Sequence, residues 1–305
     1  MTDHAAADPF AALSDRIVAL AEATGPRLVA VHGSDRRPSF SGILWSTGLV
    51  VTAAEALERD DDLAVTFADG RHLPATLAGR DAATDIALLR VEGAGEGLDA
   101  PTPGAEETLR LGQLLLALGR GEEGPIAALG IAAVVGGPWQ SLRGGRIDRR
   151  IRLDLTLRRE AEGGAVVDGA GRMLGMAVLG ARRRGALVIP TATIARAVAA
   201  YAARGRMARG YLGLAMQPLR VGRGCGAGHG LIVVGLDPGG PAERAGMVLG
   251  DVIVAWDGAP LTGGGVREVL ARLDPDSVGR RVTLDLLRGG APARVEVTIG
   301  ERPSA

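Results

Sequence analysis

Residues 67–91, FADGRHLPATLAGRDAATDIALLRV, decide how the first part of this chain folds. Asp69-Gly70 is a dipeptide typical of a β-hairpin turn. The runs around it are rich in Val, Ile, Leu and Thr, and they predict strands over 63–67, 72–78 and 85–91. This stretch therefore predicts antiparallel β-structure.

The same pattern of short strand-like segments separated by turn residues continues on both sides of this stretch. Earlier strands are predicted over 27–32, 40–45 and 48–52, and a second set over 113–118, 126–135, 150–157, 164–167, 173–179 and 186–189. Apolar residues spaced one helical turn apart predict helices over 10–23 and 191–204, which flank the two sets. Two sets of six short strands are typical of an all-β protein with two similar barrels.

Residues 210–300 have a mixed pattern that predicts an α+β module. Its strands are expected near 211–216, 231–236, 252–256, 282–287 and 294–299, and its helices near 241–245 and 264–273. A chain of 305 residues is long enough for two or three domains. We place the boundaries at 1–24 for an amino-terminal segment with a short helix, 25–107 and 108–204 for the two barrels, and 208–303 for the last module.

Composition excludes several classes of function. The 35 basic residues, all of them Arg, balance 35 acidic ones, which argues against binding of nucleic acid or an anionic membrane by the whole protein. The basic loop Arg182-Arg183-Arg184 has no aromatic residues nearby for stacking on bases, so we expect no nucleic-acid partner. Cys225 is the only cysteine, which excludes an internal disulfide. No apolar run is long enough to span a membrane, and no secretory signal follows the acidic amino terminus, so a cytoplasmic location is expected.

Four stretches resemble the HtrA (Deg) family of trypsin-like serine proteases. They are GLVVTAAEAL (48–57), the stretch 67–91, REAEGGAVVDGAGRMLGM (159–176) and GLDPGGPAERAGMVLGDVIVAWDG (235–258). The resemblance implies an all-β chymotrypsin-like double β-barrel followed by an α+β PDZ domain. It also implies a homotrimer, because HtrA proteins commonly associate through the amino-terminal part of the protease domain.

The resemblance breaks at the positions that carry catalysis. A serine protease needs a hydroxyl nucleophile, an imidazole base and a carboxylate that orients the imidazole. Here Asp85 matches the family's aspartate, but Glu55 stands where the family has its histidine and Glu162 where it has its serine. Glu160 replaces the glycine two residues before the nucleophile. We therefore expect a pseudoprotease. Asp85 and Gly163-Gly164 either are retained from the catalytic site or only maintain the local fold.

Two alternatives remain open for this region. An active serine endopeptidase would need another residue set, for which His32, His72 and Ser141 are the candidates. A metal-binding protein would use Glu55, Asp85 and Glu162, since three carboxylates placed together repel and suit Ca²⁺, Mg²⁺ or Mn²⁺. No cofactor is expected otherwise.

The last module carries the predicted binding site. In PDZ domains, backbone N–H groups of a loop before the edge strand receive the terminal carboxylate of a peptide, which adds a strand to the sheet. The resemblance places this loop at Arg209, Tyr211, Leu212, Gly213 and Leu214, with Val266, Val269 and Leu270 facing the ligand from a helix. We thus expect an adaptor or regulator that binds protein C-termini or exposed peptide segments.

Overall fold

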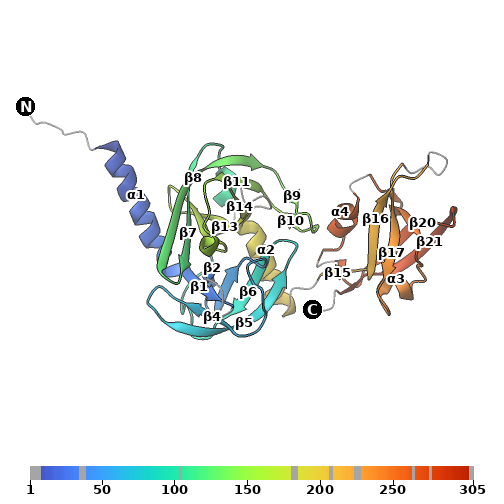
Figure 1. Ribbon diagram of the computed structural model, residues 1–305, viewed down its shortest axis with the longest axis horizontal. Helices are drawn as coiled ribbons and strands as arrows, with labels where there is room; N and C mark the ends of the chain where they lie inside the picture. The colour runs from blue at the N-terminus through green and yellow to red at the C-terminus, as the bar shows by residue number, and fades with distance from the viewer. Residues whose placement is uncertain are drawn as a thin grey trace, which may run out of the picture. The chain divides into compact units, whose positions relative to one another are not determined.

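The computed structural model describes residues 8–33, 39–102, 105–179, 185–205, 209–222, 228–262, 265–274 and 277–301. The chain forms two compact units, Met1–Trp139 with Ile147–Gly205, and Gln140–Arg146 with Arg206–Ala305 (Figure 1). The arginine loop 182–184 and Cys225 lie outside the described residues. Across the described ranges, no helix combines the length and apolar character needed to cross a membrane.

The first six strands close into a barrel in the order β1-β2-β3-β6-β5-β4. Their bounds are β1 Leu28–His32, β2 Phe40–Ser46, β3 Leu49–Thr52, β4 Leu63–Thr66, β5 His72–Asp81 and β6 Ile86–Arg90. The Asp69-Gly70 turn joins β4 to β5 as the sequence predicts, with Gly70 at φ +84°. Aliphatic side chains from all six strands fill the barrel, among them Val29, Val50, Val65, Ala75 and Leu89.

A second barrel repeats the topology of the first. Its strands are β7 Leu114–Gly121, β8 Gly124–Gly136, β11 Arg150–Asp154, β12 Ala165–Asp168, β13 Met173–Leu179 and β14 Ala186–Pro190. They close in the order β7-β8-β11-β14-β13-β12, so the two barrels have the same strand order. The short strands β9 Trp139–Gln140 and β10 Arg146–Ile147 pair outside the barrel. The expected double β-barrel is thus the observed fold.

Short helices connect and cover the barrels. They are α1 Pro9–Thr24, α2 Thr191–Arg204 and the 3-10 turns η1 Gly25–Arg27, η2 Ala105–Thr108 and η3 Arg159–Ala161. The carboxylate of Glu106 in η2 is 1% exposed and accepts hydrogen bonds from the Thr191 hydroxyl (2.6 Å) and the Ala192 amide (3.0 Å). A carboxylate satisfies the unpaired amides at a helix start, so Glu106 fixes where α2 begins.

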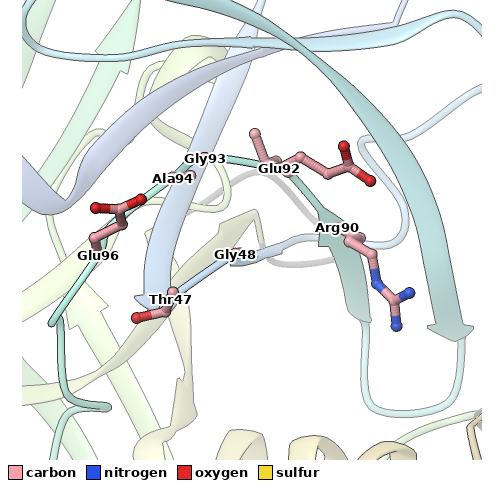
Figure 2. A pocket seen from close by; sticks show the side chains of 8 residues that line it. Thr47, Gly48, Arg90, Glu92, Gly93, Ala94 and Glu96 are labelled. Carbon is pink, nitrogen blue, oxygen red and sulfur yellow. The ribbon is translucent and has the colours of Figure 1, made fainter.

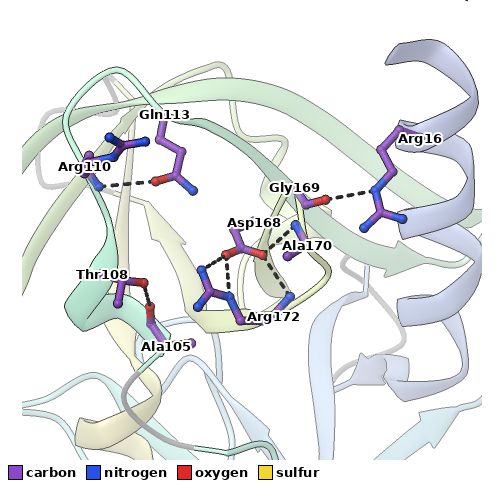
Figure 3. A network of polar contacts seen from close by, with 9 residues as sticks. All are labelled: Arg16, Ala105, Thr108, Arg110, Gln113, Asp168, Gly169, Ala170 and Arg172. Carbon is purple, nitrogen blue, oxygen red and sulfur yellow. Dashed lines mark hydrogen bonds and ion pairs between the residues drawn. The ribbon is translucent and has the colours of Figure 1, made fainter. Parts of the chain in front are cut away.

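Helix α1 is held against the turn between β12 and β13. Figure 3 shows the buried Asp168 carboxylate accepting hydrogen bonds from the Ala170 and Arg172 amides and from the Arg172 guanidinium, which fixes this turn. The exposed Gly169 carbonyl then accepts a hydrogen bond of 2.9 Å from Nε of Arg16 on α1. Leu20 is the buried anchor of the helix, while its amino-terminal half exposes apolar side chains.

The second unit contains a sheet in the order β16-β17-β18-β20-β21, with β19 paired to β18. The strands are β15 Gly210–Tyr211, β16 Leu214–Leu219, β17 Gly230–Leu236, β18 Val252–Trp256, β19 Ala259–Pro260, β20 Arg281–Arg288, β21 Ala291–Thr298 and β22 Gly300–Glu301, and the helices are α3 Pro241–Arg244 and α4 Val266–Ala271. The Asp251 carboxylate is inaccessible and accepts two hydrogen bonds of 2.8 Å from Arg288, which hold its pKa below the ordinary range. Strand β16 lies at the edge of this sheet.

Candidate functional site

Asp85, the carboxylate retained from the triad, serves the backbone here. It precedes β6 with φ +58°, a conformation that aspartate tolerates better than most residues. Its Oδ1 atom accepts a hydrogen bond of 2.7 Å from the amide of Glu55, and its carbonyl accepts one of 3.3 Å from Ala54. Asp85 thereby fixes the turn after β3, while the Glu55 side chain is exposed to solvent.

Glu162, at the nucleophile position, points its carboxylate into the protein. The residue is 8% exposed, and its Oε1 atom accepts a hydrogen bond of 3.0 Å from the amide of Leu179 at the end of β13. Its carbonyl accepts another of 2.8 Å from Ser41 on β2. A buried carboxylate needs such partners because desolvation disfavours its charge. Glu162 therefore ties β13 and the first barrel to the loop that carries it.

The backbone amide of Glu162 is engaged in a turn. In a serine protease the amide of the nucleophile donates to the developing oxyanion. Here the Glu162 amide donates a hydrogen bond of 3.1 Å to the carbonyl of Arg159, because residues 159–161 form the 3-10 turn η3. Stabilising an oxyanion would require this turn to open.

Ser41 is buried and makes several of the hydrogen bonds of this region. No sequence signal predicted this role. Its hydroxyl donates a hydrogen bond of 2.6 Å to the Glu160 carbonyl and accepts one of 2.9 Å from the Arg120 amide. Thr52 donates a further hydrogen bond of 2.7 Å to the Ser41 carbonyl. Contacts between residues this far apart in sequence depend on the docking of the two barrels. Ser41 therefore sets the position of the loop before Glu162.

An exposed ion pair links the two barrels beside these residues. Arg159 of η3 approaches Glu58, which follows β3, with 3.7 Å between guanidinium and carboxylate. Both side chains are well exposed, so the pair contributes at most about 1 kcal/mol. Its significance is positional, because it connects the segment after Glu55 to the segment before Glu162.

The three carboxylates at the triad positions do not form a metal centre. Among the residues that the structure describes, which include Glu55, Asp85 and Glu162, no group of three or more Asp, Glu, His or Cys side chains is arranged to hold a metal ion. Asp85 accepts a hydrogen bond from a backbone amide, Glu162 accepts one from the Leu179 amide, and Glu55 is an exposed residue. Within the described part of the chain, these three residues therefore do not form a ready-made cation site.

The other candidate nucleophile and bases also have structural partners. Nε2 of His32 and Nδ1 of His72 each lie 2.9 Å from the Thr66 hydroxyl, and burial and the neighbouring His72 lower the pKa of His32. The Ser141 hydroxyl accepts hydrogen bonds from the amides of Arg143 (3.2 Å) and Gly145 (3.1 Å). His32 and His72 are thus hydrogen-bonded to Thr66, and Ser141 is hydrogen-bonded to its own turn.

Two surface hollows in the described part of the chain are lined by residues other than the predicted site residues. One of about 310 Å³ is formed by Thr47-Gly48 and the segment 90–96, with Arg90, Glu92 and Glu96 around it (Figure 2). The Thr47 hydroxyl donates to the Gly95 carbonyl at 2.8 Å, so it closes a loop. Another hollow of about 460 Å³ borders Glu106, which caps α2. Neither hollow is lined by a triad position.

The loop before β16 has its carbonyl groups bonded inside the domain. The Leu212 carbonyl accepts a hydrogen bond of 2.8 Å from Ala242, and the Gly213 carbonyl accepts one of 2.9 Å from Asp237. Because N–H and C=O of a trans peptide point in opposite directions, the amides of Gly213 and Leu214 point away from those partners. Gly213 has φ +72°, a backbone conformation that glycine adopts without steric cost. Successive backbone amides of this kind are the donors that form anion-binding nests.

Two flanking residues of this loop make structural contacts. Tyr211 donates its hydroxyl hydrogen bond to the Asp237 carboxylate. A guanidinium nitrogen of Arg209 lies 3.2 Å from the carbonyl of Arg143, within the same unit. Leu212 is 2% exposed and belongs to the core, whereas Leu214 is half-buried against it.

Helix α4 presents two of its three predicted ligand-facing residues at the core margin. Val266 and Leu270 are half-buried and pack against the core. Val269 is fully inaccessible and belongs to the core itself, so its prediction as a ligand-facing residue is wrong. Residues spaced three and four apart share one helical face, and this pattern alone does not distinguish a core face from a binding face.

Sequence profiles of two known domains match the chain. Residues 40–176 match the trypsin-like peptidase domain, and residues 210–299 match the PDZ domain. The first match ends within β13 and spans Glu55, Asp85 and Glu162, and the second spans the loop before β16 and helix α4.

Individual proteins are similar over most of this chain. A probable periplasmic serine endoprotease DegP-like of Halomonas elongata is 30% identical over 287 residues, covering 90% of this chain and 59% of its own length. The solved structure of the serine endoprotease from Yersinia pestis is 25% identical with a TM-score of 0.71, covering 95% of this chain and 98% of that one. An HtrA-type protease AlgW structure with a decapeptide is 23% identical with a TM-score of 0.71, covering 95% and 99%, and this shows likeness of fold.

These relatives correct the expected location. Three of them, from Halomonas elongata, Ectopseudomonas mendocina and Bartonella henselae, are named periplasmic. The expectation of a cytoplasmic protein is therefore contradicted. It was based on the first residues of the chain, whereas the chain spans only 52–59% of the length of these relatives.

Proposed function

This chain belongs to the HtrA family of trypsin-like proteins with a carboxy-terminal PDZ domain, and we propose that it binds the C-termini of other polypeptides without cleaving them. Peptide binding is supported by the loop before the edge strand β16, where the Leu212 and Gly213 carbonyls are bonded inside the domain and the next amides point away from those partners. The absence of cleavage is supported by Glu162, whose side chain and amide are both engaged inside the fold.

The binding reaction follows from the chemistry of the loop. A peptide carboxylate is an anion that accepts hydrogen bonds from the Gly213 and Leu214 amides, and the peptide then extends along β16 as an additional strand. The half-buried Leu214, Val266 and Leu270 provide an apolar surface for the side chains of the ligand. The expected ligand is therefore a free C-terminus that ends in an apolar residue.

Titration calorimetry of the whole chain with a peptide acid and its C-terminal amide tests this function. We expect the acid to bind with a Kd in the micromolar range, about −8 kcal/mol. Amidation removes the charge and the charge-assisted hydrogen bonds, each contributing about 1.5–3 kcal/mol, so the amide should bind about 10- to 100-fold more weakly. Equal affinities would show that the loop does not recognise a terminus.

Leu214→Asp should weaken acid binding to a similar extent, because it places a second carboxylate beside that of the ligand. Leu249→Asp is the matched control, since Leu249 is 64% exposed and lies after α3. Both variants are first compared with the wild type by thermal melting, so that a folding defect in Leu214→Asp is recognised.

Self-association is the second part of the proposal. Apolar side chains are exposed along α1 and the outer face of the β7–β8 hairpin, namely Phe10 (78%), Leu13 (40%), Val18 (52%), Leu114 (45%), Leu129 (44%) and Ile131 (39%). Apolar surfaces of this kind on a soluble protein mark interaction sites. Since HtrA proteins commonly trimerise through the amino-terminal part of the protease domain, we infer that two further copies of this chain cover these residues.

Light scattering of the purified chain tests the assembly. At micromolar concentration we expect a mass three times the 31.2 kDa of one chain. Phe10→Asp combined with Ile131→Glu should yield the monomer, because each places a charge in the apolar contact, while Leu249→Asp should leave the trimer intact. A wild type that elutes with the mass of one chain would refute the assembly.

A further inference from the structure

Strand β16 forms the free edge on which a bound peptide would add. Its six residues, Leu214–Leu219, pair only with β17 in the described sheet. The register joins Met216 to Val233 and Pro218 to Leu231. In an antiparallel pair, the residues alternate between positions that bond to the partner strand and positions that bond on the outer side. Which residues face outward is set by their partners on β17.

The hydrogen bonds of Val233 determine this alternation. Its amide donates to the Asp251 carbonyl at 2.8 Å, and its carbonyl accepts from the Gly250 amide at 2.9 Å. Both groups therefore point toward the segment before β18 and away from β16. Leu231 lies two residues earlier with no irregularity between them, so it points the same way. Met216 and Pro218 consequently direct their backbone groups to the free edge.

Proline at one of these two outward positions shortens the usable edge. Met216 offers both an amide N–H and a carbonyl, whereas Pro218 offers only a carbonyl because its nitrogen carries no hydrogen. Proline is tolerated in sheets mainly where its missing N–H faces outward from an edge strand. The ring is exposed and β16 ends one residue later.

A second observation places the amino-terminal end of α4 against the same residue. A Cβ atom at Gly265, which precedes α4, would lie 3.5 Å from Cγ of Pro218. At the other end of the helix, a Cβ at Gly210 would lie 3.0 Å from Cα of Leu273. Helix α4 therefore runs antiparallel to β16, with Pro218 at the end remote from the loop 212–214.

We infer that Pro218 limits this domain to ligands read over their last four residues. The inference rests on the proposed function. A ligand whose carboxylate lies at Gly213 and Leu214 runs antiparallel to β16, so its third residue from the end pairs with Met216 and its fifth with Pro218. The carbonyl of that fifth residue finds no donor on the strand. Of the two main-chain hydrogen bonds that such a pair forms, only the one from the ligand N–H to the Pro218 carbonyl remains, so residues beyond the fourth add little to binding.

Calorimetry with two peptides tests the limit. The probes are the last four and the last eight residues of one sequence, both with free carboxylates and apolar last residues. We expect the wild type to bind them within about twofold of each other. Pro218→Ala restores an edge N–H, and the longer peptide should then bind about 2- to 10-fold more tightly than the shorter one, as one net hydrogen bond provides. Gln217→Ala is the control, because Gln217 directs its backbone toward β17.

The outcomes separate this inference from the proposed function. If neither peptide binds, both are overturned. If the wild type binds the longer peptide fivefold or more tightly, C-terminal binding stands and the role of Pro218 is overturned. If Pro218→Ala shows the same flat length dependence as the wild type and Gln217→Ala, the missing N–H is not what limits the ligand.

Discussion

Unfolded casein incubated with the purified chain is expected to remain intact. A serine protease that loses its triad keeps a rate only about 10³- to 10⁴-fold above that in water, and it owes this remainder to the oxyanion hole and substrate binding. In this protein the Glu162 amide donates to the Arg159 carbonyl and is not available to an oxyanion. We therefore expect the residual rate of cleavage to be lower still. Gel electrophoresis after overnight incubation should show the same casein band with and without the protein.

The control for this experiment is trypsin at equal concentration, which degrades the casein. Cleavage by the chain that is lost in Ser141→Ala or in a variant of His32 or His72 would show that another residue set performs catalysis. Cleavage that persists in these variants and is removed by further purification would identify a contaminating protease.

Gly163→Ala is expected to destabilise the barrel unit by about 3 kcal/mol or more. Gly163 has φ +86°, and a Cβ atom there would lie 2.1 Å from the Ser41 carbonyl oxygen and 2.7 Å from the Thr52 hydroxyl. A non-glycine residue in this conformation costs about 1–2 kcal/mol, and overpacking adds about 1–3 kcal/mol. For a unit of this size the melting temperature should fall by about 6–12 °C.

Gly137→Ala is the matched control for this substitution. A Cβ atom at Gly137 meets no atom within 4 Å, so its melting temperature should stay within about 2 °C of the wild type. A Gly163→Ala protein that melts with the wild type would refute the packing argument. The comparison matters because it gives Gly163 a structural purpose that is independent of catalysis.

The strand pattern predicted most of the fold because its periodicity and turn residues are local. The hairpin at Asp69-Gly70 and helix α2 are found where these signals place them. The role of Val269 was predicted wrongly, since one apolar helical face serves both core and ligand contact. The Ser41 hydrogen bonds were not predictable, because they join residues 79 and 119 positions apart.

The substitutions at the triad positions were visible in the sequence, but their consequences were not. The family resemblance placed three carboxylates close together, and their repulsion was expected to be relieved by a proton, an arginine or a cation. In the structure, Glu162 accepts a hydrogen bond from the Leu179 amide and Asp85 accepts one from the Glu55 amide. Backbone donors of this kind carry no sequence signature, since every residue except proline has an amide N–H.

The most direct test of non-catalytic function is the intact mass of the chain after treatment with a fluorophosphonate probe, which reacts with activated serine hydroxyls. The protein described here has no imidazole at Glu55 and no hydroxyl at Glu162, so we expect the mass to remain that of the untreated chain. A single adduct, mapped to one serine and abolished by replacing that serine with alanine, would contradict the account.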